Sequence, residues 1–505
     1  MKHTQKPNPA PSKFSRSSSL ALGAATLLAS GIFRQGLGVV TLAVTARLLR
    51  PEDFGIIAYF LIFVALLEMI QRQISMVLIR LDAVSNEHLH TVFTLQVIFG
   101  VLAAGLVWAS APVVALFGIP ELVEILPAVS AISLLIALRN PRFLLYERGL
   151  RFSLAAAEET LNRIVYAVVA IYLAWIWRDF WAVIVATFAG IAMRNVWTFT
   201  TAPMMPKLSL SRSRDCLSFS TWAIGAQLSQ FMANSIPQIF IGATLGLADA
   251  GIYRVGSRII SIVTTQLFAP LQRVIYPGLA DVSRSSGRKA SAFITLNALL
   301  LSIVLPLSIG SALIAEDAIV YGLGFKWIAA AQVIWVLAPL KALETLQANV
   351  RAASYIEGST KSLFMRNALL LVLVCVFMWV GTQYGFHGAL AAAALSSFSA
   401  LMITLVLAKS FGTGGFFEPL TVAWRSFLAC ALMVVAVIAT DMALRSGADV
   451  PRLLVIVLTK VGVGATVYTV VHIALWRMTG RPEGLETLIV SLASRLRGRF
   501  GRPKV

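Results

Sequence analysis

The chain has 505 residues, of which 58% are hydrophobic and only 13% are charged, and its mean hydropathy is +0.82. A soluble domain carries about 25% charged residues, so this chain has too few polar side chains to cover a large water-facing surface. The composition therefore excludes a soluble globular protein. It predicts that lipid covers much of the surface.

The net charge of +19 raises the alternative of nucleic-acid binding. The lysines and arginines lie mainly between the apolar stretches and in the two terminal segments, as orientation charges do in membrane proteins. We therefore expect no nucleic-acid partner. Cys216, Cys375 and Cys430 lie far apart without metal-ligand or CxxC spacing, so neither a disulfide nor a zinc site is predicted.

Hydrophobic runs long enough to cross a bilayer follow one another along the chain. A transmembrane helix needs about 20 mostly apolar residues. The run from Leu20 is too long for a signal peptide and is interpreted as a retained first helix. The sequence predicts an all-α polytopic membrane protein with about fourteen spans, at 20–47, 54–78, 91–117, 122–145, 155–177, 180–203, 218–244, 251–277, 291–315, 327–350, 362–384, 387–409, 420–440 and 452–477.

The basic residues between these spans predict the orientation. With a cytoplasmic N-terminus, the cytoplasmic connections and tails hold about 28 lysines and arginines and the outer connections about 6. An even number of spans with both ends inside produces this asymmetry. We expect a multi-pass protein of the bacterial inner membrane with both termini in the cytoplasm.

The two halves of the chain share short sequence matches in a common order. Leu49–Ile56 follows the first span and Leu245–Ile252 follows the seventh, and Leu, Asp, Gly and Ile recur in the two segments at one fixed offset. Two facing parallel repeats are typical of transporters, with the substrate path between them. The predicted organisation is a cytoplasmic tail (1–19), an N-terminal six-helix lobe (20–203), a basic cytoplasmic linker (204–217), a C-terminal six-helix lobe (218–410), two additional transmembrane helices (411–478) and a basic cytoplasmic tail (479–505).

The sequence contains no catalytic constellation. It has no P-loop, so we expect no ATP hydrolysis by the chain itself, and we expect no cofactor or metal. The acids of the turn Pro51-Glu52-Asp53 suit a helix start, where proline is tolerated and the dipole favours negative charge. We interpret them as helix-start residues and not as catalytic acids, and we predict that the protein is not an enzyme.

Cationic residues inside the predicted spans are the strongest candidates for function. Arg34 with Gln35 lies in the first span, and Arg254 and Arg258 are one turn apart in the eighth. Burying such a charge costs several kcal/mol, so it normally faces a cavity or a partner. The hypothesis is an anion-binding cluster around a central cavity. The alternative is that Arg254 and Arg258 reach the outer boundary of the membrane.

Five further charged residues carry weaker hypotheses. Arg163 in the fifth span and Arg366 in the eleventh are candidates for the same cluster, although orientation charge is the default near cytoplasmic helix ends. Lys341 and Glu344 are three residues apart and are expected to neutralise each other. Lys460 lies outside the repeated core and could equally line a lipid or partner site.

The seventh span carries a series of polar side chains at spacings of three and four: Gln227, Gln230, Asn234 and Gln238. This spacing places all four on one helix face. The series could join helices by hydrogen bonds or form the sugar-facing wall of a passage. The sequence leaves these alternatives open.

Three segments resemble the Wzx-type polysaccharide transporters of the multidrug/oligosaccharidyl-lipid/polysaccharide flippase superfamily. They are Leu48–Gly55 after the first span, Leu144–Phe152 after the fourth, and Pro270–Ala280 in the second half. The resemblance implies a V-shaped pair of lobes working by alternating access, with cationic residues in the lumen. It implies that a lipid-linked oligosaccharide on undecaprenyl pyrophosphate is turned to the outer leaflet. It also implies inner-membrane lipids, a polysaccharide polymerase and chain-length or export proteins as partners.

Two other classes compete with this interpretation. A drug/cation antiporter of the same superfamily usually has twelve spans and an acidic lumen, whereas the central charges here are basic. A membrane polysaccharide polymerase needs large outer loops with catalytic residues, and every predicted outer connection is short.

Overall fold

The computed structural model describes residues 13–115, 119–149, 152–217, 221–266, 289–347, 350, 360–409, 415–444 and 450–480. Within these ranges the regular structure is helical and no strand occurs. The segment Pro270–Ala280 and most of the two predicted tails lie outside the described residues.

The first half consists of α1 (Lys13–Leu48), α2 (Pro51–Arg80), α3 (Asn86–Ala109), α4 (Ala111–Ala115), α5 (Pro120–Glu124), α6 (Leu126–Ala137), η1 (Pro141–Phe143), α7 (Leu144–Arg148), α8 (Phe152–Trp177) and α9 (Trp181–Thr201). α10 (Ser213–Leu217) leads to the second half. This comprises α11 (Thr221–Thr244), α12 (Leu247–Ser261), η2 (Ile262–Gln266), α14 (Lys289–Leu313), α15 (Ala315–Gly322), η3 (Phe325–Trp327), α16 (Ala329–Leu343), α18 (Thr360–Gly381), η4 (Thr382–Tyr384) and α19 (Gly385–Lys409). Three C-terminal helices follow: α20 (Glu418–Thr421), α21 (Trp424–Leu444) and α22 (Val450–Met478).

Each of the fourteen predicted ranges overlaps at least one of these helices. Among the described residues, nine helices are long and apolar enough to cross a membrane, or ten if the bent pair formed by residues 297–313 and 315–322 is one span. One of the nine runs over 49 residues, from Lys361 to Lys409. A straight helix of that length would extend about 74 Å, but its two parts, α18 and α19, pack against each other, so this segment is a hairpin.

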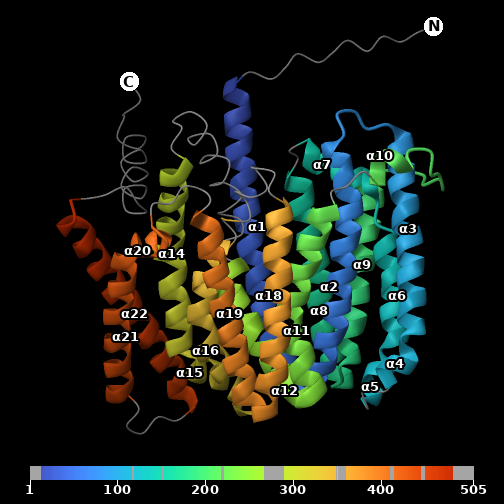
Figure 1. The fold of residues 1–505 in the computed structure, drawn as a ribbon. Coiled ribbons are helices and arrows are strands. Elements are labelled where there is room, and N and C mark those ends of the chain that lie inside the picture. The colour runs from blue at the N-terminus through green and yellow to red at the C-terminus, as the bar shows by residue number, and fades with distance from the viewer. Residues whose placement is uncertain are drawn as a thin grey trace, which may run out of the picture.

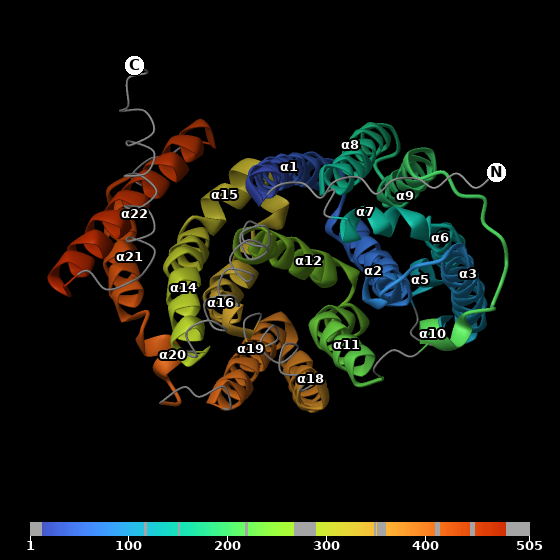
Figure 2. The same cartoon turned by 90° about the horizontal axis from the view of Figure 1, so that it is seen from above.

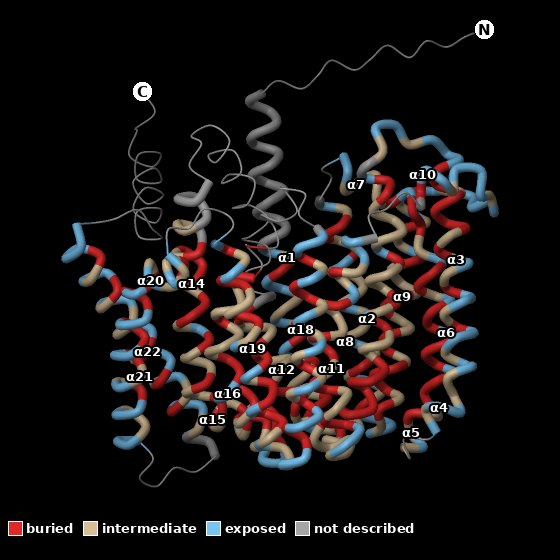
Figure 3. Tube along the Cα trace, in the orientation of Figure 1, coloured by how far each residue is buried: buried red, intermediate tan, exposed pale blue. Residues whose placement is uncertain are grey.

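The long helices stand side by side, and Figure 1 shows α1 beginning and α22 ending on the same face of the molecule. Exposed residues recur along the outer helices (Figure 3). Large apolar side chains are among the exposed ones, such as Leu106, Trp175, Trp379 and Val435. An exposed apolar surface this extensive is stable only when lipid covers it. The protein is therefore an all-helical, multi-pass membrane protein.

The packing of helices in the first half recurs in the second. α1 packs against α8, α8 against α9, α3 against α6, and α6 against both α2 and α9. In the second half α11 packs against α18, α18 against α19, α14 against α16, and α16 against both α12 and α19. Figure 2 shows the two sets side by side, with α2 of the first set next to α12 of the second.

α2 and α12 pack against each other closely at their first turns. α2 begins as predicted, with Pro51 at its first position and the Asp53 carboxylate accepting a hydrogen bond from the Arg50 backbone N–H (2.8 Å). A Cβ atom added to Gly55 would overlap the backbone of Leu247, and one added to Gly251 would overlap the backbone of Pro51. The offset is the same in both cases (251 − 55 = 196 and 247 − 51 = 196), so the repeated segments contact each other reciprocally.

A second set of contacts joins the two halves at this end, the lower end in Figure 1. Arg47 at the end of α1 donates to the carbonyl oxygens of Tyr321 and Gly322. Lys326 donates to the carbonyl oxygens of Arg47 and Leu49, and the buried Trp327 indole donates to that of Ala46. We call these contacts of Arg47, Lys326 and Trp327 the latch; together with the α2–α12 crossing they close this end.

The C-terminal helices attach beside the second set. α21 packs against α22 and α14, and α22 contacts α15. Lys460 of α22 is buried and forms ion pairs with Asp317 of α15 and Asp441 of α21. The structure thus places Lys460 in a buried ionic joint between three helices, a role that its sequence position did not reveal.

Candidate functional site

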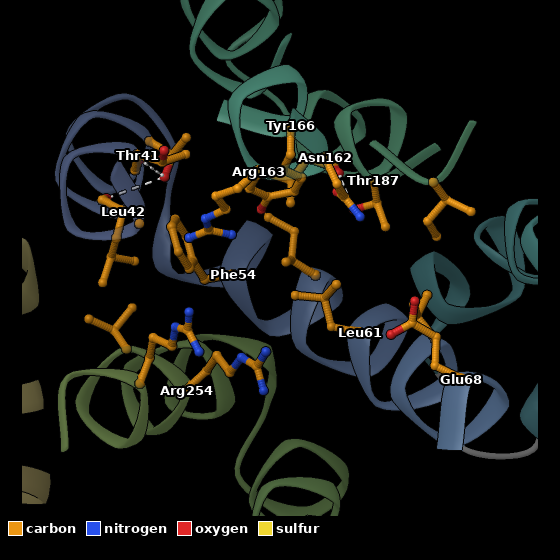
Figure 4. Close-up of a pocket in the computed structure, with 18 residues that line it drawn as sticks. Thr41, Leu42, Phe54, Leu61, Glu68, Asn162, Arg163, Tyr166, Thr187 and Arg254 are labelled. Atoms are coloured by element: carbon orange, nitrogen blue, oxygen red, sulfur yellow. Dashed lines mark hydrogen bonds between the residues drawn. The ribbon is translucent and has the colours of Figure 1, made fainter. Parts of the chain in front are cut away.

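A central cavity of about 330 Å³ lies between α1, α2, α8, α9 and α12. Its polar lining includes Thr41 and Thr45 of α1, and Asn162 and Tyr166 of α8. Figure 4 shows Arg163 on the α8 wall and Arg254 on the α12 wall opposite, with their guanidinium groups turned toward the space between them. We call this space, which Arg258 also lines, the arginine cavity.

Arg163 reaches this cavity across a glycine. A Cβ atom on Gly38 would lie 2.5 Å from Arg163 Nη2, so the missing side chain leaves room for the guanidinium beside α1. The Arg163 Cζ atom lies 5.0 Å from the centroid of the Tyr166 ring, at cation–π distance. Gly38 and Tyr166 thus hold a half-buried arginine in the interior of the helix assembly.

Arg254 and Arg258 come from successive turns of α12 and are also half-buried. Arg163 and Arg254 lie close enough to Arg258 to repel its charge. Among the described residues, no carboxylate forms an ion pair with any of the three arginines. Three converging guanidinium groups without a counter-charge form a site that favours an anion.

One carboxylate does line the arginine cavity. Glu68 of α2 lies at its far side in Figure 4 and forms an ion pair with Arg194 of α9 (2.6 Å). Because Arg194 neutralises Glu68, the charge that remains in the cavity is positive.

Arg34 and Gln35 are not among the residues that line the arginine cavity. Arg34 forms an ion pair with Glu159 of α8 (2.8 Å), and Gln35 is half-buried on α1. The neighbouring Glu158 is buried and pairs with Arg139 (3.2 Å). Sequence reasoning missed Glu68, Glu158 and Glu159, whose partners lie in distant segments of the chain.

A second cavity, of about 420 Å³, lies between α11, α12 and α16. It is lined by Gln230, Asn234, Gln238, Tyr253, Arg254, Ser257, Ile260, Ser261, Thr264, Leu337, Lys341, Glu344, Thr345 and Gln347. We call it the amide cavity. Arg254 lines both cavities, so they are neighbours around α12.

The polar series of α11 divides between two surroundings. Gln230 donates to Asn234 (3.2 Å), and both line the amide cavity together with the buried Gln238. Gln227 accepts a hydrogen bond from Gln73 of α2 and so joins the two helix sets. The structure therefore places Gln227 in an interhelical contact and the other three at a cavity.

Lys341 and Glu344 form the expected pair, with Lys341 Nζ 2.7 and 2.9 Å from the two carboxylate oxygens. Arg366 does not line the arginine cavity. It is buried and donates to Gln347 (2.8 Å), Thr404 (2.9 Å) and Asn367 (2.9 Å). In the described part of the chain, no group of three or more His, Cys, Asp or Glu residues could hold a metal ion.

Comparison with solved structures shows the fold. The chain is similar to the structure of the lipid II flippase MurJ in an inward closed conformation, with a TM-score of 0.71 at 11% identity. The match covers 90% of this chain and 99% of that one. At this identity the likeness shows the fold alone, and it agrees with the flippase fold implied by the sequence resemblance.

Comparison with curated proteins gives two relatives. The succinoglycan biosynthesis transport protein ExoT of Rhizobium meliloti (strain 1021) is 27% identical over 331 residues, and the teichuronic acid biosynthesis protein TuaB of Bacillus subtilis (strain 168) is 24% identical over 317. The matches cover 64% and 61% of this chain and 66% and 65% of the relatives, just under two thirds of either relative's length. A family model described as polysaccharide biosynthesis protein matches residues 44–332, more than half of the 505 residues. The chain thus belongs to this family of polysaccharide biosynthesis proteins, the Wzx-type transporters that its sequence resembles.

Proposed function

We propose that this protein is a flippase that turns oligosaccharide repeat units, linked to undecaprenyl pyrophosphate, from the cytoplasmic to the outer leaflet of the bacterial inner membrane. The units would serve exopolysaccharide, capsule or O-antigen synthesis. The observation that carries the proposal is the convergence of Arg163, Arg254 and Arg258 in one cavity, where none of them pairs with a carboxylate of the described residues. A diphosphate is the anion that such a cluster would bind.

The proposed layout has fourteen spans. The first helix set forms the lobe 20–203, the second forms the lobe 218–410, the segment 204–217 links them, and residues 411–478 form two additional spans. The recurrence of the same helix packings supports two lobes. The common face on which α1 begins and α22 ends supports an even number of crossings (Figure 1), and the basic residues predict that this face is cytoplasmic.

In this orientation the latch and the α2–α12 crossing close the outer end. The two arginines of α12 come from the second lobe and Arg163 from the first, so the cluster spans the lobe interface. Alternating access would separate the lobes at the outer end and release the diphosphate there. An inside-negative potential favours outward movement of negative charge by about 2.3 kcal/mol per charge per 100 mV.

The glycan needs a polar passage because each hydroxyl that enters hydrocarbon without a hydrogen bond costs about 4–8 kcal/mol. A repeat unit with many hydroxyls therefore does not cross unaided. We propose that Gln230 and Asn234 of the amide cavity, which adjoins the arginine cavity, replace part of the lost hydration. For Arg34, Gln35 and Gln227 we propose a supporting role at the borders of the passage.

Deletion of the gene followed by analysis of lipid-linked intermediates tests the proposal. We expect complete lipid-linked repeat units to accumulate in the cytoplasmic leaflet. Complementation with Arg163→Gln, Arg254→Gln or Arg258→Gln should fail or be weak, and the matched control Arg212→Gln, in the exposed linker, should restore export. Unchanged precursor pools with a loss of drug resistance would instead support the antiporter, and incomplete polymerisation of precursors already on the outer side would support a polymerase.

A further inference from the structure

The lining of the amide cavity differs in chemistry from that of the arginine cavity. Of its fourteen lining residues only Ile260 and Leu337 are apolar, and most of the others carry an uncharged amide or hydroxyl group. Its volume of about 420 Å³ falls in the range of pockets that hold small organic ligands, about 300–1,000 Å³. The amide and hydroxyl groups of this wall can form hydrogen bonds to a ligand rich in hydroxyl groups.

The amide of Gln347 has a determined orientation. Its Oε1 atom accepts a hydrogen bond from Arg366 Nη2 (2.8 Å), and because a guanidinium group only donates, the oxygen must face Arg366. The NH₂ group therefore faces away from Arg366. Gln347 is 7% exposed, and in the described part of the chain its Nε2 atom has no hydrogen-bond acceptor.

Gln238 presents a second donor of this kind. It is 5% exposed, and its Nε2 atom also lacks an acceptor among the described residues. Leaving a buried donor unsatisfied costs about 1–3 kcal/mol. Both side chains line the amide cavity, and a ligand with oxygen acceptors there would satisfy these two donors.

The charged pair at the same cavity adds no net charge to it. Lys341 and Glu344 neutralise each other at 2.7 Å, and both line the cavity. The Lys341 ammonium can donate to a hydroxyl oxygen and the Glu344 carboxylate can accept from a hydroxyl group. Neighbouring hydroxyl groups on a sugar ring satisfy both requirements.

We propose that the amide cavity binds sugar rings of the lipid-linked glycan while the arginine cavity holds the diphosphate. Gln347 and Gln238 donate to ring hydroxyl or acetamido oxygens, and Arg254, which lines both cavities, lies where diphosphate and sugar meet. Arg366 is a positioning residue that orients the Gln347 amide. This inference rests on the proposed flippase function and adds the sugar-recognition site to it.

The test compares two probes on the purified full-length protein in lipid nanodiscs: bare undecaprenyl diphosphate, and the lipid-linked oligosaccharide extracted from a deletion strain of the host. The Gln347→Glu variant keeps the size of the side chain and its contact with Arg366 but removes the NH₂ donor. We expect it to bind the glycan-bearing lipid about two- to ten-fold more weakly, as for one lost neutral hydrogen bond. Its affinity for the bare lipid should not change.

Two controls separate this site from a structural effect. Gln383→Glu makes the same change at an exposed position outside the cavity and should bind both probes as the wild type does. Arg366→Met should also bind the glycan-bearing lipid more weakly while its affinity for the bare lipid stays unchanged. Arg366→Lys, which keeps a donor for Gln347, should restore the affinity for the glycan-bearing lipid. Thermal unfolding of each variant shows whether it is folded.

Equal binding of the two probes by the wild type, or an equal loss of both in Gln347→Glu, would overturn the inference and indicate a cavity that holds water alone. The proposed function is tested separately by Arg258→Gln, which should weaken binding of the bare lipid. Loss of bare-lipid binding in Arg258→Gln together with an inert Gln347→Glu would therefore leave the flippase proposal standing without the sugar site.

Discussion

α2 and α12, one from each helix set, cross with backbone against backbone, and a single methyl group there should shift the conformational equilibrium. In Gly251→Ala the added Cβ would lie 2.9 Å from the carbonyl carbon of Pro51 and 3.0 Å from the backbone nitrogen of Gly55, with the Pro51 oxygen closer still. Ordinary contacts between such atoms are about 3.5–4.0 Å. The helices must therefore move apart by about 1 Å where backbone faces backbone.

Overpacking a rigid contact in this way costs about 1–3 kcal/mol. The cost applies only to the state in which the outer end is closed, because α2 and α12 no longer touch once the lobes separate. The closed state should therefore lose population relative to the open state by about five- to 150-fold. Gly55→Ala should have a similar effect, since it faces the backbone of Leu247 in the same manner.

A reporter cysteine measures this shift. Thr45→Cys places a thiol on a buried, cavity-lining position of α1 near the closed end, in a background from which the three native cysteines have been removed. We expect a membrane-impermeant maleimide added outside spheroplasts to label it faster in Gly251→Ala, in proportion to the open population. Gly310→Ala is the matched control, because a Cβ there meets no atom within 4 Å. Unchanged labelling in Gly251→Ala, or equal acceleration in Gly310→Ala, would refute the reasoning.

Three further predictions concern the latch, the ionic joint and the arginine cavity. Trp327→Phe removes the indole donor to the Ala46 carbonyl oxygen (2.8 Å), so the Thr45→Cys thiol should be labelled about two- to ten-fold faster, as for the loss of one hydrogen bond; no acceleration would contradict this. Lys460→Met leaves the buried Asp317 and the half-buried Asp441 without their lysine and should destabilise the protein by about 3 kcal/mol. A lower unfolding temperature than in Lys409→Met would show this. Arg258→Gln relieves repulsion from its two neighbours, so the ligand-free protein should unfold at a higher temperature. Added pyrophosphate should then raise the unfolding temperature less than in the wild type. A rise of wild-type size would argue against an anion site.

Much of the helical architecture follows from hydrophobic run length, which is a local property of the chain. The start of α2 at Pro51 was predicted from proline and acid preferences at helix N-termini, and the Lys341–Glu344 pair from spacing along one helix. By contrast, the predicted ninth span ends at 315, whereas the structure bends there and continues with another helix, α15 (Ala315–Gly322). Run length does not contain that information.

The site was predictable only in part, because its members meet through contacts between distant helices. Arg254 and Arg258 were identified as a pair from their one-turn spacing, and the structure places Arg163 opposite them. Arg34 looked equivalent in the sequence, but Glu159 of another helix pairs with it. Arg366 likewise looked like a lumen charge, whereas its partners, Gln347 and Thr404, are 19 and 38 residues away along the chain.

The acceptors in the latch have a consequence for how the protein tolerates its surroundings. Arg47, Lys326 and Trp327 all donate to main-chain carbonyl oxygens and not to side-chain carboxylates. A carboxylate partner would be protonated at low pH and the ion pair would be lost. A main-chain carbonyl oxygen still accepts hydrogen bonds at low pH, because it is not protonated in the physiological range. Acidification alone would therefore leave these latch hydrogen bonds in place.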